Sequence, residues 1–416
     1  MNTVRNLTAR LALAGTALIA APVYATNGMN LDAYGAVAGG MGGASFAYDN
    51  GNAAMMNNPA TLGMRSEGSR FSLGLTALLP EIETAMPSPA GGTMTVESDG
   101  RLYLMPALAF VRKTGRFTYG AGVFAQGGMG TEWGSRLSGG TGLEQRSEVG
   151  FGRLMFPLAY NVNDALIVAA QVEHVWGSLD LKMINPKTGD YYSFSNDNDF
   201  TGEATGSGWA YKLGLLYRLT PDVAIGATYH STTNINKVKG SGYVNTPATP
   251  ADFEVVDPEW PETYGVGMAW QATDTLLLAA DIKVLRWSQS LDVFCLKVNG
   301  QPACAAGGAP QHWDDQTVYL LGGQYRFARD WSLRMGYNHA ASPVPDDTLN
   351  PLAPAIVESH FTLGLGWRMD GERQLDFALT YSPSASQTNP NLFGPGVAGE
   401  VTHEQITVRL DYDYRF

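Results

Sequence analysis

The residue types that most often carry out chemistry are present in this chain but are not grouped. Six histidines occur, and their positions lack the spacing of a zinc site. The run Gly39–Gly43 follows no candidate strand and has no Lys-Ser or Lys-Thr after it, so it does not resemble a phosphate-binding loop. Asn196–Asp199 could bind Ca²⁺ in a loop, although a solvated acidic loop is the simpler interpretation. The sequence therefore predicts a protein that is not an enzyme and uses no metal or cofactor.

Some charged residues occupy alternating positions of candidate strands, where they would line the inside of a closed sheet. They are Lys212, Arg218, Asp281, Lys283, Arg326, Arg334, Arg368, Asp376, Arg409 and Asp411. One interpretation is a wall of ion pairs. The other is that some Arg or Lys side chains hold a carboxylate head group through paired, charge-assisted hydrogen bonds.

The last twelve residues, Gln405–Phe416, show what kind of element positions these side chains. Apolar or aromatic residues stand at every even position and polar ones at every odd position, a period that puts them on opposite faces of a strand. A soluble sandwich strand could have this pattern. The aromatic residues gather near Phe416, however, which is typical of the closing strand of a bacterial outer-membrane barrel.

The same alternation recurs along the chain, with aromatic residues near the ends of the segments, as in a lipid-facing band with aromatic girdles. The segments include Phe71–Ala77, Trp209–Leu219, Trp331–Asn338, Phe361–Arg368 and Leu375–Ser382. Six short connections are expected near 113–115, 161–164, 220–222, 273–274, 328–330 and 370–372. Seven long ones are expected near 81–100, 128–147, 184–207, 240–259, 296–312, 342–357 and 384–400. The two lengths take turns, which predicts a closed antiparallel barrel of 14 strands.

Residues 1–25 have the features of a signal peptide. Arg5 and Arg10 give a positive start, Leu11–Ala21 is a short apolar run, and Val23–Ala25 is a small-residue cleavage site. A buried N-terminal helix is the alternative. Cleavage would change the formal net charge from −12 to −14, because two arginines and no acidic residues are lost. An acidic chain without a basic cluster argues against a nucleic-acid partner.

The composition after this segment also favours a barrel. No apolar run approaches the roughly 18 residues of a spanning helix. Glycine accounts for 49 of 416 residues and charged residues for 16%, and the glycine share is well above the usual value of about 7%. An exported chain of this kind fits a transmembrane β-barrel, whose signal is alternation rather than mean hydropathy.

Residues 26–68 show no strand alternation and are rich in Gly, Ala and Asn, so we expect a compact insert inside a larger structure. Within it, Asn58-Pro59-Ala60 should start a short helical turn, with Asn58 as N-cap and Pro59 as first helical residue. The two cysteines, Cys295 and Cys304, are close in sequence, and a disulfide across a surface loop is expected; free thiols are the alternative.

Several stretches together make the chain resemble the long-chain fatty acid transporter (FadL/TodX-type) family of outer-membrane proteins, which includes aromatic hydrocarbon transporters. Asn58-Pro59-Ala60 resembles the end of the family's N-terminal hatch. The segment Phe117–Gly122, continuing to Gly127-Gly128 and Trp133, is similar to its third strand. Trp260-Pro261-Glu262 and Trp287-Ser288-Gln289 resemble the eighth and ninth strands, and Trp331–Pro345 the eleventh strand and its loop.

The resemblance implies a 14-stranded barrel (69–416) with a hatch (26–68) in its lumen, in a Gram-negative outer membrane. It implies uptake of a hydrophobic small molecule, such as a long-chain fatty acid or a hydrocarbon, by a monomer surrounded by lipid and lipopolysaccharide. Substrate would leave sideways through a kinked third strand. Glycines within a strand mark bends, so Gly127 and Gly128 are the expected kink; the alternative is that they begin an outer loop. The competing functions are a general diffusion porin, which needs no hatch, and a structural or adhesive barrel.

Overall fold

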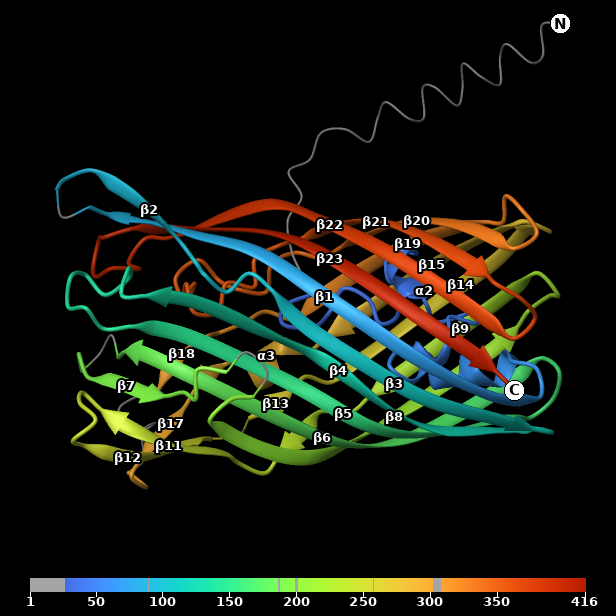
Figure 1. Cartoon of the computed structure of the whole chain (residues 1–416), viewed down its shortest axis with the longest axis horizontal. Helices are drawn as coiled ribbons and strands as arrows, with labels where there is room; N and C mark the ends of the chain where they lie inside the picture. Colours follow the sequence, from blue (N-terminus) through green and yellow to red (C-terminus); the bar gives the residue numbers. More distant parts are fainter. Residues whose placement is uncertain (1–26, 89, 186–187, 199–200, 257, 302–307) are drawn as a thin grey trace, which may run out of the picture.

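Long antiparallel strands form a closed ring in the computed structural model, which describes residues 27–416 apart from 89, 186–187, 199–200, 257 and 302–307. The expected signal peptide therefore lies outside the described residues. The last strand pairs with the first, from Arg70 opposite Arg415 to Ala85 opposite Glu400, and this pairing closes the ring (Figure 1). In order of pairing, the ring contains β1 (Gly68–Pro87), β3 (Tyr103–Thr114), β4 (Phe117–Gly134), β5 (Gln145–Asn161), β6 (Leu166–Ile184), β8 (Ala204–Arg218), β9 (Val223–His230), β14 (Thr263–Thr273), β15 (Leu276–Leu285), β19 (Gln316–Tyr325), β20 (Trp331–His339), β21 (Ser359–Arg368), β22 (Arg373–Asn389) and β23 (Gly399–Arg415).

The described sheet as a whole has 21 strands, more than the 14 expected. The additional short strands are β2 (Thr93–Glu97), β7 (Tyr191–Phe194), β10 (Thr233–Ile235), β11 (Val238–Val244), β12 (Pro250–Val255), β13 (Glu259–Trp260) and β17 (Leu296–Val298). A separate pair, β16 (Val293–Phe294) and β18 (Ala309–Pro310), forms a second sheet. Several predicted loops were therefore wrong in detail, because long connections fold back as hairpins whose backbone groups pair with the ring.

The six short connections lie where they were expected, and they share one end of the ring with the C-terminus (Figure 1). The long connections are at the opposite end. Two of the expected strand assignments need correction. Trp260 lies just before β14 in β13, and Trp287 begins a short helix, α3 (Trp287–Ser290), just after β15.

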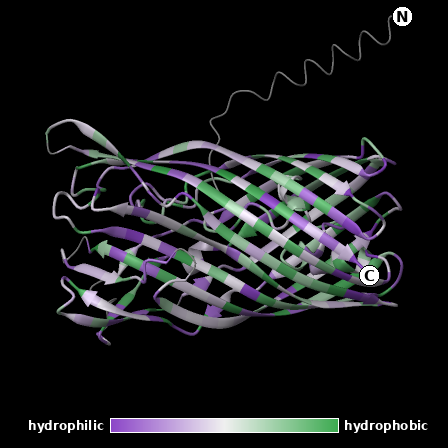
Figure 2. Cartoon of the chain, in the orientation of Figure 1, coloured by the Kyte–Doolittle hydropathy of each residue, from purple (hydrophilic) through white to green (hydrophobic). Residues whose placement is uncertain are grey.

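The outer surface of the ring is apolar, as the alternation predicted. On β8, Trp209 is 60% exposed and Leu213 47%, whereas Lys212 between them is 3% exposed. On β23, Leu410 is exposed and its neighbour Arg409 is fully buried. Figure 2 shows hydrophobic residues repeating along the strands. A period of two thus presents apolar side chains to lipid and polar ones to the interior.

Residues 27–67, called the N-terminal segment below, are almost entirely buried. They form a short helix and two 3₁₀ helices, α2 (Ala36–Gly39), η1 (Asn52–Met55) and η2 (Pro59–Met64). Figure 1 draws this segment in blue within the ring. The amide of Ser45 donates to Asp281 Oδ2 on β15 over 2.6 Å, and that of Ala36 donates to Asp411 Oδ2 on β23 over 2.7 Å. The segment therefore contacts separate parts of the barrel wall.

Small residues allow this close packing. A Cβ atom on Gly336 of β20 would lie 2.1 Å from the backbone nitrogen of Gly42, so the wall and the segment meet backbone to backbone. Among the described residues, no helix is long and apolar enough to cross a membrane.

Candidate functional site

The barrel wall is incomplete between β3 and β4. Their pairing runs from Thr114 opposite Phe117 to Leu108 opposite Val123 and stops there. Beyond Val123, β4 continues to Gly134 paired only with β5 among the described strands, while β3 continues to Tyr103 paired with β1. The next backbone hydrogen bond across the break is the one that Asp99 N donates to Glu132 O over 2.7 Å. We call the interval 124–131 of β4 the wall gap.

Local sequence explains where the ladder ends. Pro106 on β3 has no amide hydrogen, which suits an unpaired strand edge. On β4 the register with β5 shifts between Ala125 and Gly127, which leaves Gln126 as the extra residue of a bulge. Gly127 has a φ of 153°, and a Cβ atom there would lie 2.2 Å from Met29 O. The predicted kink residues Gly127 and Gly128 thus lie within β4, at the bulge, and do not begin the outer loop.

The start of the N-terminal segment lies against this free edge. Asn30 and Gly127 form an isolated antiparallel bridge, and Gly128 N donates to Met29 O over 3.0 Å. A cavity beside the gap is lined by Met29, Leu31, Leu78, Ile82, Tyr103 and Met129, among others. A second cavity lies closer to the end of the ring that holds the six short connections, which we call the turn end. It is lined by Leu31, Met105, Pro106, Ala107, Phe124 and Ala125, among others. Both sides of the gap therefore offer largely apolar surface.

Gln126 connects the bulge to the N-terminal segment. Its Nε2 donates to Asn30 Oδ1 over 2.7 Å, and the Tyr34 hydroxyl donates to its backbone oxygen over 2.5 Å. Arg153 Nε donates to Gln126 Oε1 over 2.5 Å. Because the bulge turns an extra polar side chain inward, β4 and the N-terminal segment share one buried hydrogen-bond network. Burial raises the pKa of the Tyr34 hydroxyl, so this group stays a neutral donor.

The network continues across the interior through Arg153, whose side chain is completely buried. Its Nη1 pairs with Glu173 Oε2 on β6 over 2.6 Å, and its Nη2 donates to Thr233 Oγ1 over 2.8 Å. His230 Nε2 lies 3.1 Å from the same Glu173 oxygen. A buried charge of this kind is stabilised only when its partners are in place.

A further cavity lies between the N-terminal segment and the wall, and it includes Tyr34, Phe46, Gln126, Lys212, His230 and Lys283 among its lining residues. Lys212 Nζ donates to Met56 O over 2.5 Å. Of the charged residues expected inside, Lys212, Asp281, Lys283, Arg334, Asp376 and Arg409 are buried, Arg218 and Asp411 are half-buried, and Arg326 and Arg368 are exposed. Ion pairs such as Arg334 with Asp376, at 2.7 Å, account for part of this wall.

The helical turn predicted at Asn58-Pro59-Ala60 is present as the start of η2. Asn58 Oδ1 accepts from Ala60 N over 3.1 Å, and Asn58 Nδ2 donates to Leu215 O of β8 over 3.0 Å. Asn58 therefore caps the turn and also ties the N-terminal segment to the wall.

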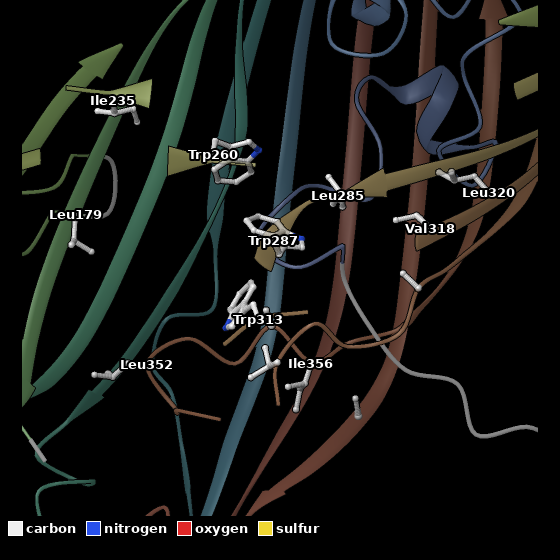
Figure 3. Close-up of a cluster of buried hydrophobic side chains, with 14 of the residues drawn as sticks. Leu179, Ile235, Trp260, Leu285, Trp287, Trp313, Val318, Leu320, Leu352 and Ile356 are labelled. Atoms are coloured by element: carbon white, nitrogen blue, oxygen red, sulfur yellow. The ribbon is translucent and has the colours of Figure 1, made fainter. Parts of the chain in front are cut away.

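Aromatic residues from two of the long connections form a buried cluster, and Figure 3 shows Trp260, Trp287 and Trp313 close together. Trp260 and Trp287 have ring centroids 5.4 Å apart, and Trp287 and Trp313 are also 5.4 Å apart. Phe151 of β5 lies 4.8 Å from Trp260. All three tryptophans are at most 2% exposed. The sequence pattern did not reveal this cluster as a site, because Trp260 lies in the β9–β14 connection, Trp287 and Trp313 lie at opposite ends of the β15–β19 connection, and the three show no common spacing.

The remaining expectations concern metals and cysteines. Across the described parts of the chain, no group of three or more His, Cys, Asp or Glu residues could hold a metal ion. Asp199 and Cys304 lie outside the described residues, so the calcium loop and the disulfide with Cys295 stay predictions. Asp197, in the first of these loops, pairs with Lys182 Nζ over 2.7 Å.

Known proteins resemble this chain over most of its length. The toluene transporter TodX of Pseudomonas putida is 26% identical with a TM-score of 0.79, and the match covers 93% of this chain and 99% of that one. The toluene transporter TbuX of Ralstonia pickettii is 28% identical with a TM-score of 0.74, at 93% and 99% coverage. A long-chain fatty acid transport protein of Escherichia coli O6:H1 is 22% identical over 378 residues, 82% of each chain.

A shorter match involves an uncharacterized protein of Chlorobium limicola, encoded 5′ of a phosphoenolpyruvate carboxykinase gene. It is 56% identical over 64 residues, which is 15% of this chain and 32% of that protein. Residues 16–416 match the family described as outer membrane protein transport protein (OMPP1/FadL/TodX), so the chain belongs to this family of outer-membrane β-barrel transport proteins.

Proposed function

We propose that this chain takes up small hydrophobic molecules across a Gram-negative outer membrane and releases them sideways through the wall gap. The observation that carries the proposal is the end of the β3–β4 ladder at Val123, with apolar cavities beside it. Apolar surface is stabilised by roughly 25 cal/mol per Å² when it leaves water. A side exit into lipid would keep such a solute away from water, whereas an axial pore would not.

The proposal assigns residues 26–68 as a hatch and residues 69–416 as a barrel whose 14 ring strands cross the membrane. Contacts of the N-terminal segment with β8, β15 and β23 support a hatch that fills the bore. Asn58, Pro59 and Ala60 would fix its far end, while Asn30 and Tyr34 hold its near end at the gap. In this arrangement the described state is closed, and the gap opens when the near end moves.

Monoaromatic hydrocarbons are the substrates we propose first. Both solved relatives reported above are toluene transporters, and an aromatic solute suits the edge-on packing found among Trp260, Trp287 and Trp313. The buried cations Lys212 and Arg153 are already hydrogen-bonded, which favours an uncharged substrate over a carboxylate. Long-chain fatty acids are the alternative, in keeping with the relative from E. coli.

The surroundings follow from the same assignment. The exposed apolar band of the strands would contact membrane lipid, and the long connections would meet lipopolysaccharide. Because each ring strand finds its partners within one chain, a monomer is sufficient for closure.

Uptake of labelled toluene, oleate and an alkane tests the proposal in a host that lacks its own transporter. Replacing Ala125, at the gap, by Trp should abolish toluene uptake, because the indole would fill the exit. The matched control is Ala121→Trp, on the same strand where β3 and β4 are paired. Equal uptake by the two variants would rule out the proposed exit. Planar-bilayer recordings separate this function from that of a porin, since an intact chain conducting like an open pore would contradict a closed hatch.

A further inference from the structure

A basic pit lies at the turn end of the barrel, and its lining includes no residue of the wall gap. Its lining includes six arginines, which are Arg65, Arg70, Arg326, Arg329, Arg334 and Arg368. Three aspartates, Asp49, Asp330 and Asp413, also line it. The lining therefore carries three more positive than negative side chains, on a chain whose formal net charge is −12.

The arginines come from both the N-terminal segment and the barrel wall. Arg65 follows η2, and Arg329 and Arg368 come from the β19–β20 turn and the end of β21. Some of these side chains are already engaged. Arg65 Nε pairs with Asp49 Oδ1 over 3.0 Å, and Arg326 Nη2 donates to Asp274 O over 2.5 Å.

Two guanidinium groups remain available. Within the described residues, the side chains of Arg329 and Arg368 have no hydrogen-bond or ion-pair partner, and both residues are exposed. Like charges gathered in one concave site repel each other, and a bound anion removes this repulsion. Guanidinium groups are planar and bind the oxygens of carboxylates and phosphates in pairs, so they suit an oxyanion better than a halide.

We propose that this pit binds a small oxyanion carrying two or more negative charges, of the phosphate type, from the periplasmic side. The anion would be held by Arg329 and Arg368 of the wall and would reach toward Arg65, which lines the same pit and lies at the C-terminal end of the N-terminal segment. Binding would then stabilise the contact between the barrel wall and the C-terminal end of the N-terminal segment, and it would not involve the wall gap. The site is independent of the hydrophobic substrate, so the uptake proposal can fail while this one holds.

Calorimetric titration of inorganic phosphate into the full chain in a maltoside detergent tests the site, with ionic strength held constant by chloride. The wild-type chain should bind, and Arg329→Gln/Arg368→Gln should weaken binding at least about tenfold, because two charge-assisted contacts are lost. The conservative double variant Arg329→Lys/Arg368→Lys keeps the charge but loses the paired donors of the guanidinium groups. Its affinity for phosphate should lie between those of the wild type and the Gln double variant.

The matched control is Arg116→Gln/Arg218→Gln, which removes the same charge at the same end but outside the pit; both side chains donate to turn carbonyls. It should bind phosphate like the wild type. Absence of binding in the wild type, or equal weakening in the control, would overturn the proposal. Binding of phosphatidylglycerol but not of inorganic phosphate would overturn it as well, since the site would then belong to a lipid headgroup.

Discussion

Arg409, on the last barrel strand, forms an ion pair through Nη2 with Asp32 of the N-terminal segment, 377 positions earlier in the chain. Neither side chain is more than 2% exposed. Thr380 of β22 completes the contact, since Arg409 Nη1 donates to its hydroxyl over 2.9 Å and the hydroxyl donates to Asp32 Oδ2 over 3.2 Å. The strand that closes the ring therefore also holds the segment inside it.

Removing one member of this pair should loosen the N-terminal segment. Asp32→Asn leaves Arg409 buried without its counter-charge, and such a loss costs about 3–5 kcal/mol. We expect a lower unfolding temperature and more frequent channel openings in planar bilayers. Asp32→Asn/Arg409→Gln, which removes both charges, should recover part of the loss. An unchanged opening frequency in the single variant would show that this pair does not hold the segment.

Acid should act on the same contact. Burial alone would raise the pKa of Asp32, but the guanidinium of Arg409 beside it, with a smaller effect of His360, holds the pKa below its usual 3.8. A lowered pKa means that the carboxylate stabilises the fold fully above its ordinary pKa and loses that effect as the pH falls through the folded value. Openings should therefore increase reversibly below about pH 3.8, and Asp32→Asn should remove the Asp32 part of that response. A pH profile identical in both proteins would contradict this.

Gln126 should be the residue that couples the bulge of β4 to the N-terminal segment. Gln126→Met keeps the length of the side chain but removes its bonds to Asn30 and Arg153. Leaving such buried groups unsatisfied costs about 1–3 kcal/mol. Amide hydrogen exchange should rise at residues 27–34 and stay unchanged around Asn58. As a control, Gln374→Met changes a glutamine that bonds to Asp376 at the turn end and should leave exchange at 27–34 unaltered.

The barrel could be predicted from the sequence because its determinants are local. In the β21–β22 hairpin, apolar and polar residues alternate along each strand, and Asp370 and Gly371 are typical turn residues between them. The faces of the strands and the position of the turn can therefore be read from residues that are close together in the chain. The N-cap at Asn58 and the glycines inside β4 are local signals of the same kind. The additional strands were missed because their Gly- and Pro-rich connections show little alternation and become strands by pairing, as β12 does with its neighbour β11 and with the distant β17.

The contacts of the site could not be predicted in the same way. Gln126 and Asn30 are 96 positions apart. The glycines indicate a bend in β4, but they do not show that Gln126 is the extra residue of a bulge and therefore faces inward. The contacts of the tryptophan cluster were equally hard to predict, because Trp260 of the β9–β14 connection meets Trp287 and Trp313 of the β15–β19 connection only after both connections have folded toward the interior.

That cluster gives the last prediction. Trp287→Ala removes the middle ring, which contacts both other tryptophans and lies against Gly28. Truncation of a buried Trp costs about 3–5 kcal/mol, and the cavity left behind should lower toluene uptake more than oleate uptake if aromatic packing selects the substrate. Trp287→Phe should keep most of both activities. The control is Trp331→Ala, which breaks the stacked pair with Trp367 on the strands at the turn end. An equal decrease in toluene and oleate uptake by Trp287→Ala, with the fold intact by circular dichroism, would contradict this prediction. The cluster would then stabilise the connections without selecting the substrate.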